Sequence, residues 1–200
     1  MGYYIVLDTE TTGLHPPQNS NIYLMDEVGR RQNRLRPDEI LQLAIIDQNG
    51  TVLFYDNFKP TIKTSWLTAQ AIHNIAPKDV ATKLPFSERV DEIQNIVAKA
   101  SFIVAYNAAF DFGFLQGNGI NLLQKPYVCA MEVFAHTLDK RKHYGSYEWK
   151  SLAYCANYFG LENAQAHDAL SDAQLTLTCF KAMADDAHFH IQPKPWKVKP

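Results

Sequence analysis

The chain has 200 residues, of which 46% are hydrophobic and 20% are charged, and its formal net charge is −2. These values are ordinary for a globular domain with a substantial core, and the near-neutral balance excludes a global charge argument for nucleic-acid binding. We expect no membrane span and no secretory signal, because no hydrophobic run is long enough and no basic segment precedes the first one. Three cysteines lie in separate apolar segments, at spacings unlike a zinc site, which predicts reduced buried thiols in a cytoplasmic protein: Cys129, Cys155 and Cys179.

Two acids follow directly on the first apolar run of the chain. Residues 4–7 predict a strand buried on both faces, and Asp8 and Glu10 project from its end on one face, because residues two apart on a strand point the same way. Neighbouring carboxylates repel each other near a low-dielectric sheet, and a bound cation removes this conflict. Hard cations such as Mg²⁺ prefer oxygen ligands, so the pair predicts a metal site, with two solvated surface acids as the alternative.

A long irregular segment comes next, and its Pro and Asn residues predict an insertion loop over residues 15–37. Its arginines suit phosphate oxygens, although a plain solvated insertion is the alternative: Arg30, Arg31, Arg34 and Arg36. Residues 38–47 and 51–58 then predict two strands joined at Asn49–Gly50, which is the strongest short hairpin signal. Residues 65–75 predict a short helix carrying His73, for which a half-buried structural role is the simplest interpretation.

Further polar residues lie where predicted elements begin or end. Residues 85–100 predict a helix and residues 101–106 a buried strand, after which Asn107 can cap a helix that carries Asp111 in its first turns. The alternative for Asp111 is an acid that only favours the helix dipole. The last helix is expected from residue 168 to about 184, with His167 before it and Asp172 within it. These two residues are roughly 140° apart on an ideal helix, so they converge only if His167 lies in the preceding loop.

Basic and aromatic side chains alternate in residues 139–150, between a strand expected over residues 125–131 and a helix expected over residues 147–159. Such interleaving suits single-stranded nucleic acid, whose bases stack on aromatic rings, and a charged surface turn is the alternative. The residues concerned are Lys140, Arg141, Lys142, His143, Tyr144, Tyr147 and Trp149.

Three blocks resemble the three exonuclease motifs of the DEDDh family, which includes the proofreading subunit of bacterial replicative polymerase, ribonuclease T and oligoribonuclease. They are residues 8–14 (DTETTGL), 107–111 (NAAFD) and 167–173 (HDALSDA), and the similarity spans about residues 3–180. The resemblance implies an α/β ribonuclease H-like fold, with a five-stranded mixed sheet flanked by helices. It also implies 3′→5′ removal of nucleoside 5′-monophosphates from DNA ends, with an exoribonuclease and a non-catalytic nucleic-acid-binding module as alternatives. The long 15–37 loop, and the absence of an Asp–Thr pair near residue 129, depart from many members.

The same resemblance implies a catalytic set and two divalent ions, Mg²⁺ with Mn²⁺ as a substitute. Asp8 would bridge both ions, Glu10 and Asp172 would complete one site, Asp111 would support the other, and His167 would act as general base. Two-metal hydrolysis clamps the attacking and leaving oxygens of an in-line displacement. Contacts to the terminal nucleotide are carried over to Thr11, Thr12, Leu14, His73, Asn107 and Phe110.

The expected organisation is an exonuclease domain over residues 1–186, followed by a flexible tail over residues 187–200 that is rich in Pro and Lys. The expected partners are single-stranded or frayed 3′ ends of DNA, with RNA as an alternative, together with a possible polymerase. In the tail, Trp196 could dock a partner, although plain disorder is favoured.

Overall fold

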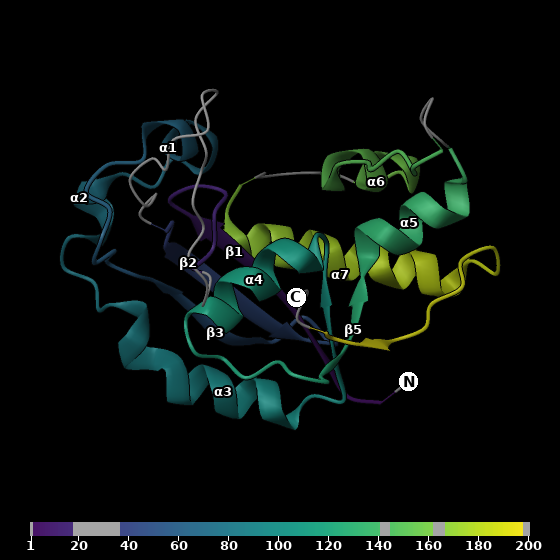
Figure 1. The fold of residues 1–200 in the computed structure, drawn as a ribbon. Coiled ribbons are helices and arrows are strands. Elements are labelled where there is room, and N and C mark those ends of the chain that lie inside the picture. Colours follow the sequence, from purple (N-terminus) through teal and green to yellow (C-terminus); the bar gives the residue numbers. More distant parts are fainter. Residues whose placement is uncertain (1, 18–36, 141–144, 162–166, 198–200) are drawn as a thin grey trace, which may run out of the picture.

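A six-stranded mixed sheet forms the centre of the computed structural model, which describes residues 2–17, 37–140, 145–161 and 167–197 (Figure 1). The strand order is β3-β2-β1-β4-β5-β6. β1 pairs antiparallel with β2 and parallel with β4, so that the central strand lies between a hairpin and a parallel pair. The strands are β1 (Tyr4–Thr11), β2 (Ile40–Asp47), β3 (Val52–Asn57), β4 (Phe102–Ala105), β5 (Pro126–Cys129) and β6 (Lys194–Pro195).

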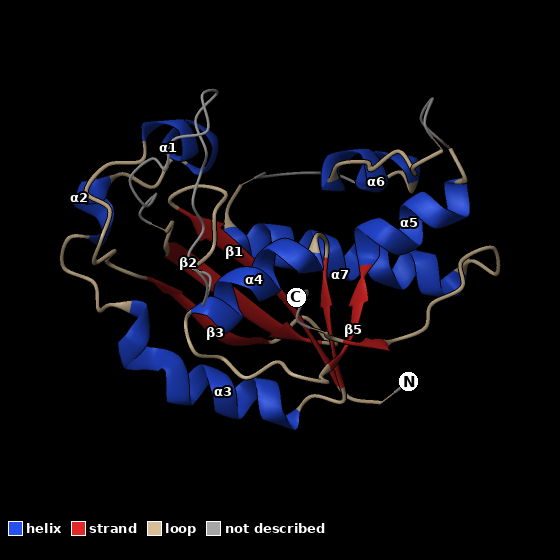
Figure 2. Cartoon of the chain, in the orientation of Figure 1, coloured by secondary structure: helices blue, strands red, loops and turns tan. Residues whose placement is uncertain are grey.

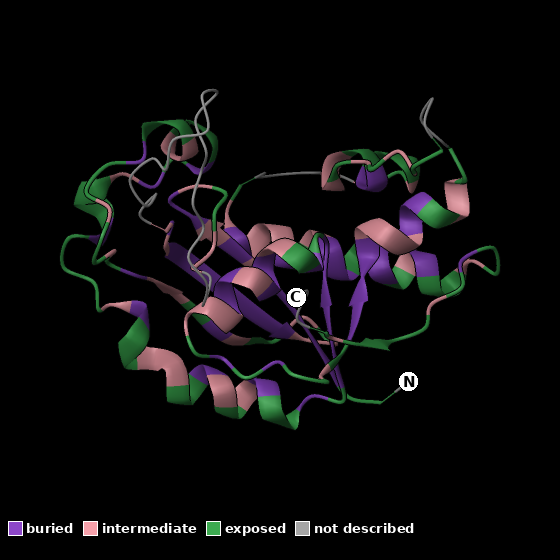
Figure 3. Cartoon of the chain, viewed as in Figure 1, coloured by how far each residue is buried: buried purple, intermediate pink, exposed green. Residues whose placement is uncertain are grey.

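Helices cover both faces of this sheet (Figure 2). The alternation of side chains along β1 sends Ile5 and Leu7 into one core, with α3 (Val90–Lys99) and α4 (Ala108–Gly117), and Tyr4 and Val6 into the other. The second core contains residues of α5 (Ala130–Leu138), α6 (Leu152–Tyr158) and α7 (Ala169–Asp185). Burial of each such large apolar side chain contributes about 1.5–3 kcal/mol, which explains why the inner strands β1, β2 and β4 are buried and the outer helix faces exposed (Figure 3).

A smaller group of elements lies beyond the end of β1. It comprises α1 (Leu67–His73) and α2 (Pro77–Val80), whereas the 3₁₀ turn η1 (Phe86–Arg89) leads directly into α3 and places Phe86 in the first core. Trp66 anchors this group, because its indole Nε1 donates to the carbonyl oxygen of Ile75 at 2.7 Å and its ring packs in a separate cluster with Leu41 and Val80. The short helix predicted over residues 65–75 is thereby confirmed at Leu67–His73.

The predicted α/β class with a mixed sheet and flanking helices is confirmed, including the hairpin at Asn49–Gly50. The predicted strand count of five is exceeded by the two-residue β6. α5 follows β5 directly and had no counterpart among the predicted elements, and the helix expected from residue 147 begins only at Leu152. The three cysteines are buried free thiols, as expected. The arginines of the 15–37 loop, and residues 141–144 of the basic stretch, lie outside the described residues.

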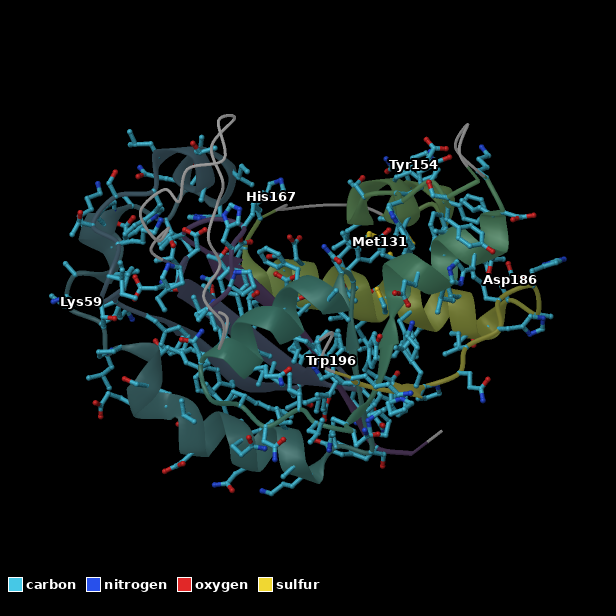
Figure 4. All side chains as sticks on the ribbon, viewed as in Figure 1. Lys59, Met131, Tyr154, His167, Asp186 and Trp196 are labelled. Atoms are coloured by element: carbon cyan, nitrogen blue, oxygen red, sulfur yellow. The ribbon has the colours of Figure 1, made fainter. Side chains whose placement is uncertain are left out.

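A flexible tail is predicted over residues 187–200, but in the structure β6 and Trp196 pack at the edge of the sheet and Phe189 packs in the second core. β6 pairs antiparallel with β5, and the Trp196 backbone exchanges hydrogen bonds with Gln124 and Lys125. The Trp196 ring contacts Phe112 and Tyr127, and its Nε1 donates to Gln116 Oε1 at 2.7 Å (Figure 4). An aromatic anchor thus fixes a segment whose composition alone favours disorder.

Candidate active site

Three carboxylates meet where β1 passes the first turn of α7. Oxygen atoms of Asp8, Glu10 and Asp172 all lie within 4.8 Å of one another. Asp8 and Glu10 share a face of β1 because they are two residues apart, and Asp172 comes from the start of the helix that packs on that face. α7 approaches the strands closely because the residues between them are small and fully buried: Ala44, Ala169 and Ala173.

Asp111 reaches the same end of β1 from α4, on the opposite face of the sheet. Its side chain is only 3% exposed, and Oδ1 accepts hydrogen bonds from the backbone N–H of Thr9 at 3.0 Å and from Thr9 Oγ1 at 2.9 Å. The charge of Asp111 is among the causes that raise the pKa of Asp8. The structure therefore brings together all four acids named from the sequence. Asn107 occupies the N-cap position of α4, but its side chain makes none of the expected capping bonds.

Burial and mutual repulsion make ionisation of these acids unfavourable. Burial, followed by the charges of Asp111, Glu10 and Asp172, raises the pKa of Asp8 well above its usual value. Burial and the charge of Asp172 raise the pKa of Glu10 to about 8, and burial raises that of Asp111 to about 7 although the Thr9 hydrogen bonds oppose it. No described lysine or arginine forms an ion pair with any of the four acids. A set of carboxylate oxygens with this unbalanced charge fits a hard divalent cation.

His167 lies in the loop immediately before α7, as its convergence with Asp172 requires (Figure 4). Its φ of +69° is in the left-handed region, which residues other than glycine adopt uncommonly. This conformation lets the backbone N–H of His167 donate to Asp172 Oδ2 at 3.2 Å, while the residue stays exposed to solvent. Backbone outliers of this kind are often found at functional sites.

A cavity of about 460 Å³ opens beside the acids, between the end of β1 and α1. Five of the six residues carried over as nucleotide contacts line it: Thr11, Thr12, Leu14, His73 and Phe110. Leu14 is 75% exposed, and Phe110 packs against Phe114 with ring centroids 5.0 Å apart, so apolar surface faces the opening. Asn107 does not line this cavity.

The polar groups of Thr11, Thr12 and His73 form hydrogen bonds with nearby residues of the protein. The Thr11 hydroxyl donates to the carbonyl oxygen of Gly13 at 2.6 Å, and the Thr12 hydroxyl donates to Asp38 Oδ1 at 3.2 Å. His73 Nδ1 accepts from the N–H of Ile75, which leaves the proton on Nε2 to be donated to the carbonyl oxygen of Thr11 at 3.1 Å. His73 therefore shapes the cavity wall with both ring nitrogens occupied, in agreement with the structural interpretation of this residue.

Asp38 holds the loop that follows β1. Its buried carboxylate accepts from Thr12, from the backbone N–H of His15 at 3.0 Å, and from Lys63, which lies 3.2 Å away. Burial opposes ionisation, but these hydrogen bonds and the Lys63 charge lower the pKa of Asp38 overall. A Cβ atom at Gly13 would lie 2.5 Å from Asp38 Oδ2, so only glycine fits between the loop and this carboxylate.

Several lining residues were not predicted from the sequence. Trp66, Leu67 and Ile72 complete the wall of the cavity on the α1 side. Leu67 and Ile72 are both exposed apolar residues on a short helix, and their exposure is visible only in the structure. Of the basic and aromatic stretch, Tyr147 and Trp149 pack near His136 of α5, with ring centroids 4.2 and 6.3 Å from the histidine ring.

Comparison with known proteins places the chain in a family. A model of an exonuclease family (RNase T) matches residues 5–180. DNA polymerase III subunit epsilon of Escherichia coli K12 is 29% identical over 188 residues, covering 90% of this chain and 70% of that protein. The same subunit of Rickettsia conorii is 29% identical over 180 residues, covering 86% of this chain and 69% of that protein.

Solved structures show the same fold at lower identity. E. coli exonuclease I in complex with a dT13 oligonucleotide superposes with a TM-score of 0.64 at 16% identity, over 92% of this chain and 41% of that one. Exonuclease X in complex with duplex DNA gives 0.56 at 19% identity, over 91% and 92% of the two chains. With the family model spanning most of the sequence, and the ribonuclease H-like fold present, the chain belongs to the exonuclease family and is a nuclease domain of the hydrolase class.

Proposed function

We propose that the chain is a metal-dependent 3′→5′ exonuclease that removes nucleoside 5′-monophosphates from DNA ends. The observation that carries this proposal is the convergence of Asp8, Glu10 and Asp172, whose oxygens lie within 4.8 Å of one another beside an apolar cavity. Carboxylates in such numbers, without a lysine or arginine partner among the described residues, favour divalent cations over an organic ligand.

Two ions would be held by different parts of the acid cluster. Asp8, Glu10 and Asp172 supply the oxygens for one ion, and Asp8 with Asp111 supplies those for the second. When bound, such a pair of ions stabilises the charge on the attacking and leaving oxygens of an in-line displacement. Mg²⁺ is proposed as the natural ion because all these ligands are hard oxygens, and Mn²⁺ is expected to replace it.

The general base of this reaction would be His167. Imidazole titrates near neutral pH and can take a proton from the attacking water at a ring nitrogen. The left-handed backbone keeps His167 out of α7, next to Asp172 and open to solvent, where substrate and water can approach it. Asp8→Ala should abolish activity. His167→Ala should instead retain metal and substrate binding.

The terminal nucleotide would occupy the cavity between β1 and α1. Its volume of about 460 Å³ lies in the range of small-molecule sites, and its exposed Leu14 and half-buried Phe110 offer apolar surface to a base. The Thr11 and Thr12 hydroxyls are engaged within their own loop, so these two residues would act through their backbone and methyl groups.

DNA is the proposed substrate, because the similar curated proteins are named as subunits of DNA polymerase III and a similar structure holds an oligonucleotide of thymidine. The same names support a polymerase as the proposed partner. Within the part of the chain that the structure describes, none of the helices has the length and apolarity to cross a membrane. The buried free thiols support a reducing, cytoplasmic environment.

The test is digestion of matched 5′-labelled DNA and RNA oligomers, single-stranded and duplex, with Mg²⁺ and with excess chelator. We expect a ladder of 5′-labelled products shortened from the 3′ end, faster release from DNA than from RNA, and no reaction with chelator. Preferential trimming of RNA would assign the exoribonuclease alternative. Binding of the oligomers without cleavage in Mg²⁺ or Mn²⁺ would assign the non-catalytic module and overturn the proposal.

A further inference from the structure

Gln42 is a polar residue within the otherwise apolar run of residues 40–46, and it is only 4% exposed. In the sheet it lies directly opposite Glu10 of β1, while its neighbour Ala44 lies between Asp8 on one side and Tyr55 of β3 on the other. Side chains of residues paired in this way share a face, so Gln42 and Tyr55 stand on the face that α7 covers. Gln42 is therefore paired across the strands with Glu10, and Tyr55 lies two strands from Asp8 at the same level of the sheet.

These two side chains converge on the first residues of α7. Tyr55 Oη donates to Asp168 Oδ2 at 2.8 Å, and Gln42 Nε2 donates to the same oxygen at 3.2 Å. Gln42 Oε1 accepts from the backbone N–H of Ala169 at 2.8 Å. The other oxygen of Asp168 accepts from the N–H groups of Leu170 and Ser171, so that the first three amides of the helix are all satisfied.

Two of the catalytic candidates, His167 and Asp172, are linked directly to Asp168. The backbone N–H of Asp172 donates to the carbonyl oxygen of Asp168 at 2.9 Å, which is the first bond of the helix, and His167 precedes Asp168 directly. The N–H of His167 in turn donates to Asp172 Oδ2. A shift of Asp168 would therefore move both Asp172 and His167 relative to Asp8 and Glu10, which belong to the strand.

We propose that Gln42 and Tyr55 are positioning residues, which hold the start of α7 through Asp168 and so set the distance between His167, Asp172 and the acids of β1. This inference rests on the proposed nuclease function and extends it to residues outside the three motifs. Tyr55 is the informative position, because it is 44% exposed on an edge strand and makes its contribution through a single hydroxyl.

The test compares Tyr55→Phe, Asp168→Asn and the double variant with wild type, in hydrolysis of a single-stranded DNA oligomer at a temperature where melting curves show every variant folded. We expect Tyr55→Phe to lower kcat about tenfold with KM changed less than about twofold, because misplacement of reacting groups acts on the chemical step. The Tyr55 hydroxyl also accepts from Gln42 Nε2 at 3.1 Å, but its own proton goes to Asp168. The double variant should therefore be little slower than Asp168→Asn alone, because Tyr55 acts mainly through Asp168. Tyr158→Phe, on the exposed side of α6, removes a hydroxyl outside this network and should match wild type.

Backbone hydrogen exchange of Ala169 and Leu170 in the metal-free protein provides a readout that needs no activity. We expect faster exchange at these amides in Tyr55→Phe and unchanged exchange in Tyr158→Phe. An active wild type with unchanged kcat in Tyr55→Phe, or additive losses in the double variant, would overturn the inference while leaving the proposed function intact. An inactive wild type would overturn the proposed function, and the exchange rates would still decide whether Tyr55 anchors α7.

Discussion

The carboxyl groups of Asp8, Glu10 and Asp111 are placed where burial and repulsion raise their pKa values, two of them to about 8 and about 7. Such groups are more protonated in the folded chain than in the unfolded one at neutral pH. The ionised acids therefore destabilise the metal-free fold at neutral pH, and bound cations would remove this cost.

This imbalance predicts the pH dependence of stability. Because the folded pKa values exceed the unfolded ones, the free energy of unfolding of the metal-free protein should fall as pH rises from 6 to 8, by about 2 kcal/mol. Urea unfolding at the two pH values in chelator measures this difference. Glu10→Gln should reduce the fall, whereas Glu88→Gln, an exposed acid of η1, should leave it unchanged. Stability that rises over this pH range would contradict the electrostatic description of the site.

His167 allows a second prediction at the residue scale. His167→Ala should lower kcat by about 10²–10⁴-fold while oligonucleotide and metal binding persist, because only proton transfer is lost. His188→Ala serves as the control, since that side chain is exposed and belongs to the C-terminal segment. An unchanged rate across neutral pH in His167→Ala would remove this residue from the mechanism.

At the scale of elements, the sequence predicted β1, the hairpin of β2 and β3, and the start of α7, because each has a local signal. The Asn49–Gly50 turn is an example of such a signal. The meeting of Asp111 with Thr9 joins residues 102 apart in sequence, and no local pattern specifies it. The motif resemblance, by contrast, named Asp111 among the site residues, although not its partner Thr9. Gln42 had a weak signal, because it is a polar residue in an apolar strand. Its contacts with Asp168 and Ala169, 126 and 127 residues away in sequence, could not be predicted.

The close contact of α7 with the sheet gives a prediction for packing. Ala173 is fully buried next to Asp172, so Ala173→Leu should overfill the interface, cost about 1–3 kcal/mol and lower Tm by several degrees. Nuclease activity should fall as well, because the helix start moves away from β1. Ala184→Leu places the same side chain on the exposed side of the same helix and should change neither quantity. Equal melting temperatures for the two variants would show that α7 does not need small residues here.

On the scale of the whole molecule, we propose that residues 1–186 carry the catalytic machinery and that residues 187–197 brace its edge. Composition alone favoured disorder for the C-terminal segment, since it is rich in Pro and Lys. Its docking depends on an edge strand, β5, and on an aromatic pocket formed by Phe112 and Tyr127. These partners come from distant parts of the chain, so the contact could not be predicted from the segment itself.

Removal of the Trp196 anchor tests this brace. Trp196→Ala deletes the ring contacts and the hydrogen bond to Gln116, and should lower the free energy of unfolding by about 3 kcal/mol. Activity well below the melting temperature should remain, because the segment does not line the cavity beside the acids. Lys197→Ala is the matched control, an exposed neighbour of the anchor. A Trp196→Ala protein as stable as this control would show that the segment contributes nothing to the fold.

The central claim is that acids from residues 8 to 172 form one site for divalent cations. Calorimetric titration of the metal-free protein with Mn²⁺ tests it most directly, comparing wild type with Asp8→Asn, Asp172→Asn and the remote Asp186→Asn. We predict that each of the first two substitutions weakens Mn²⁺ binding by more than about tenfold, since each removes a charged ligand, while Asp186→Asn binds as wild type does. Equal affinity in all four proteins would contradict the account.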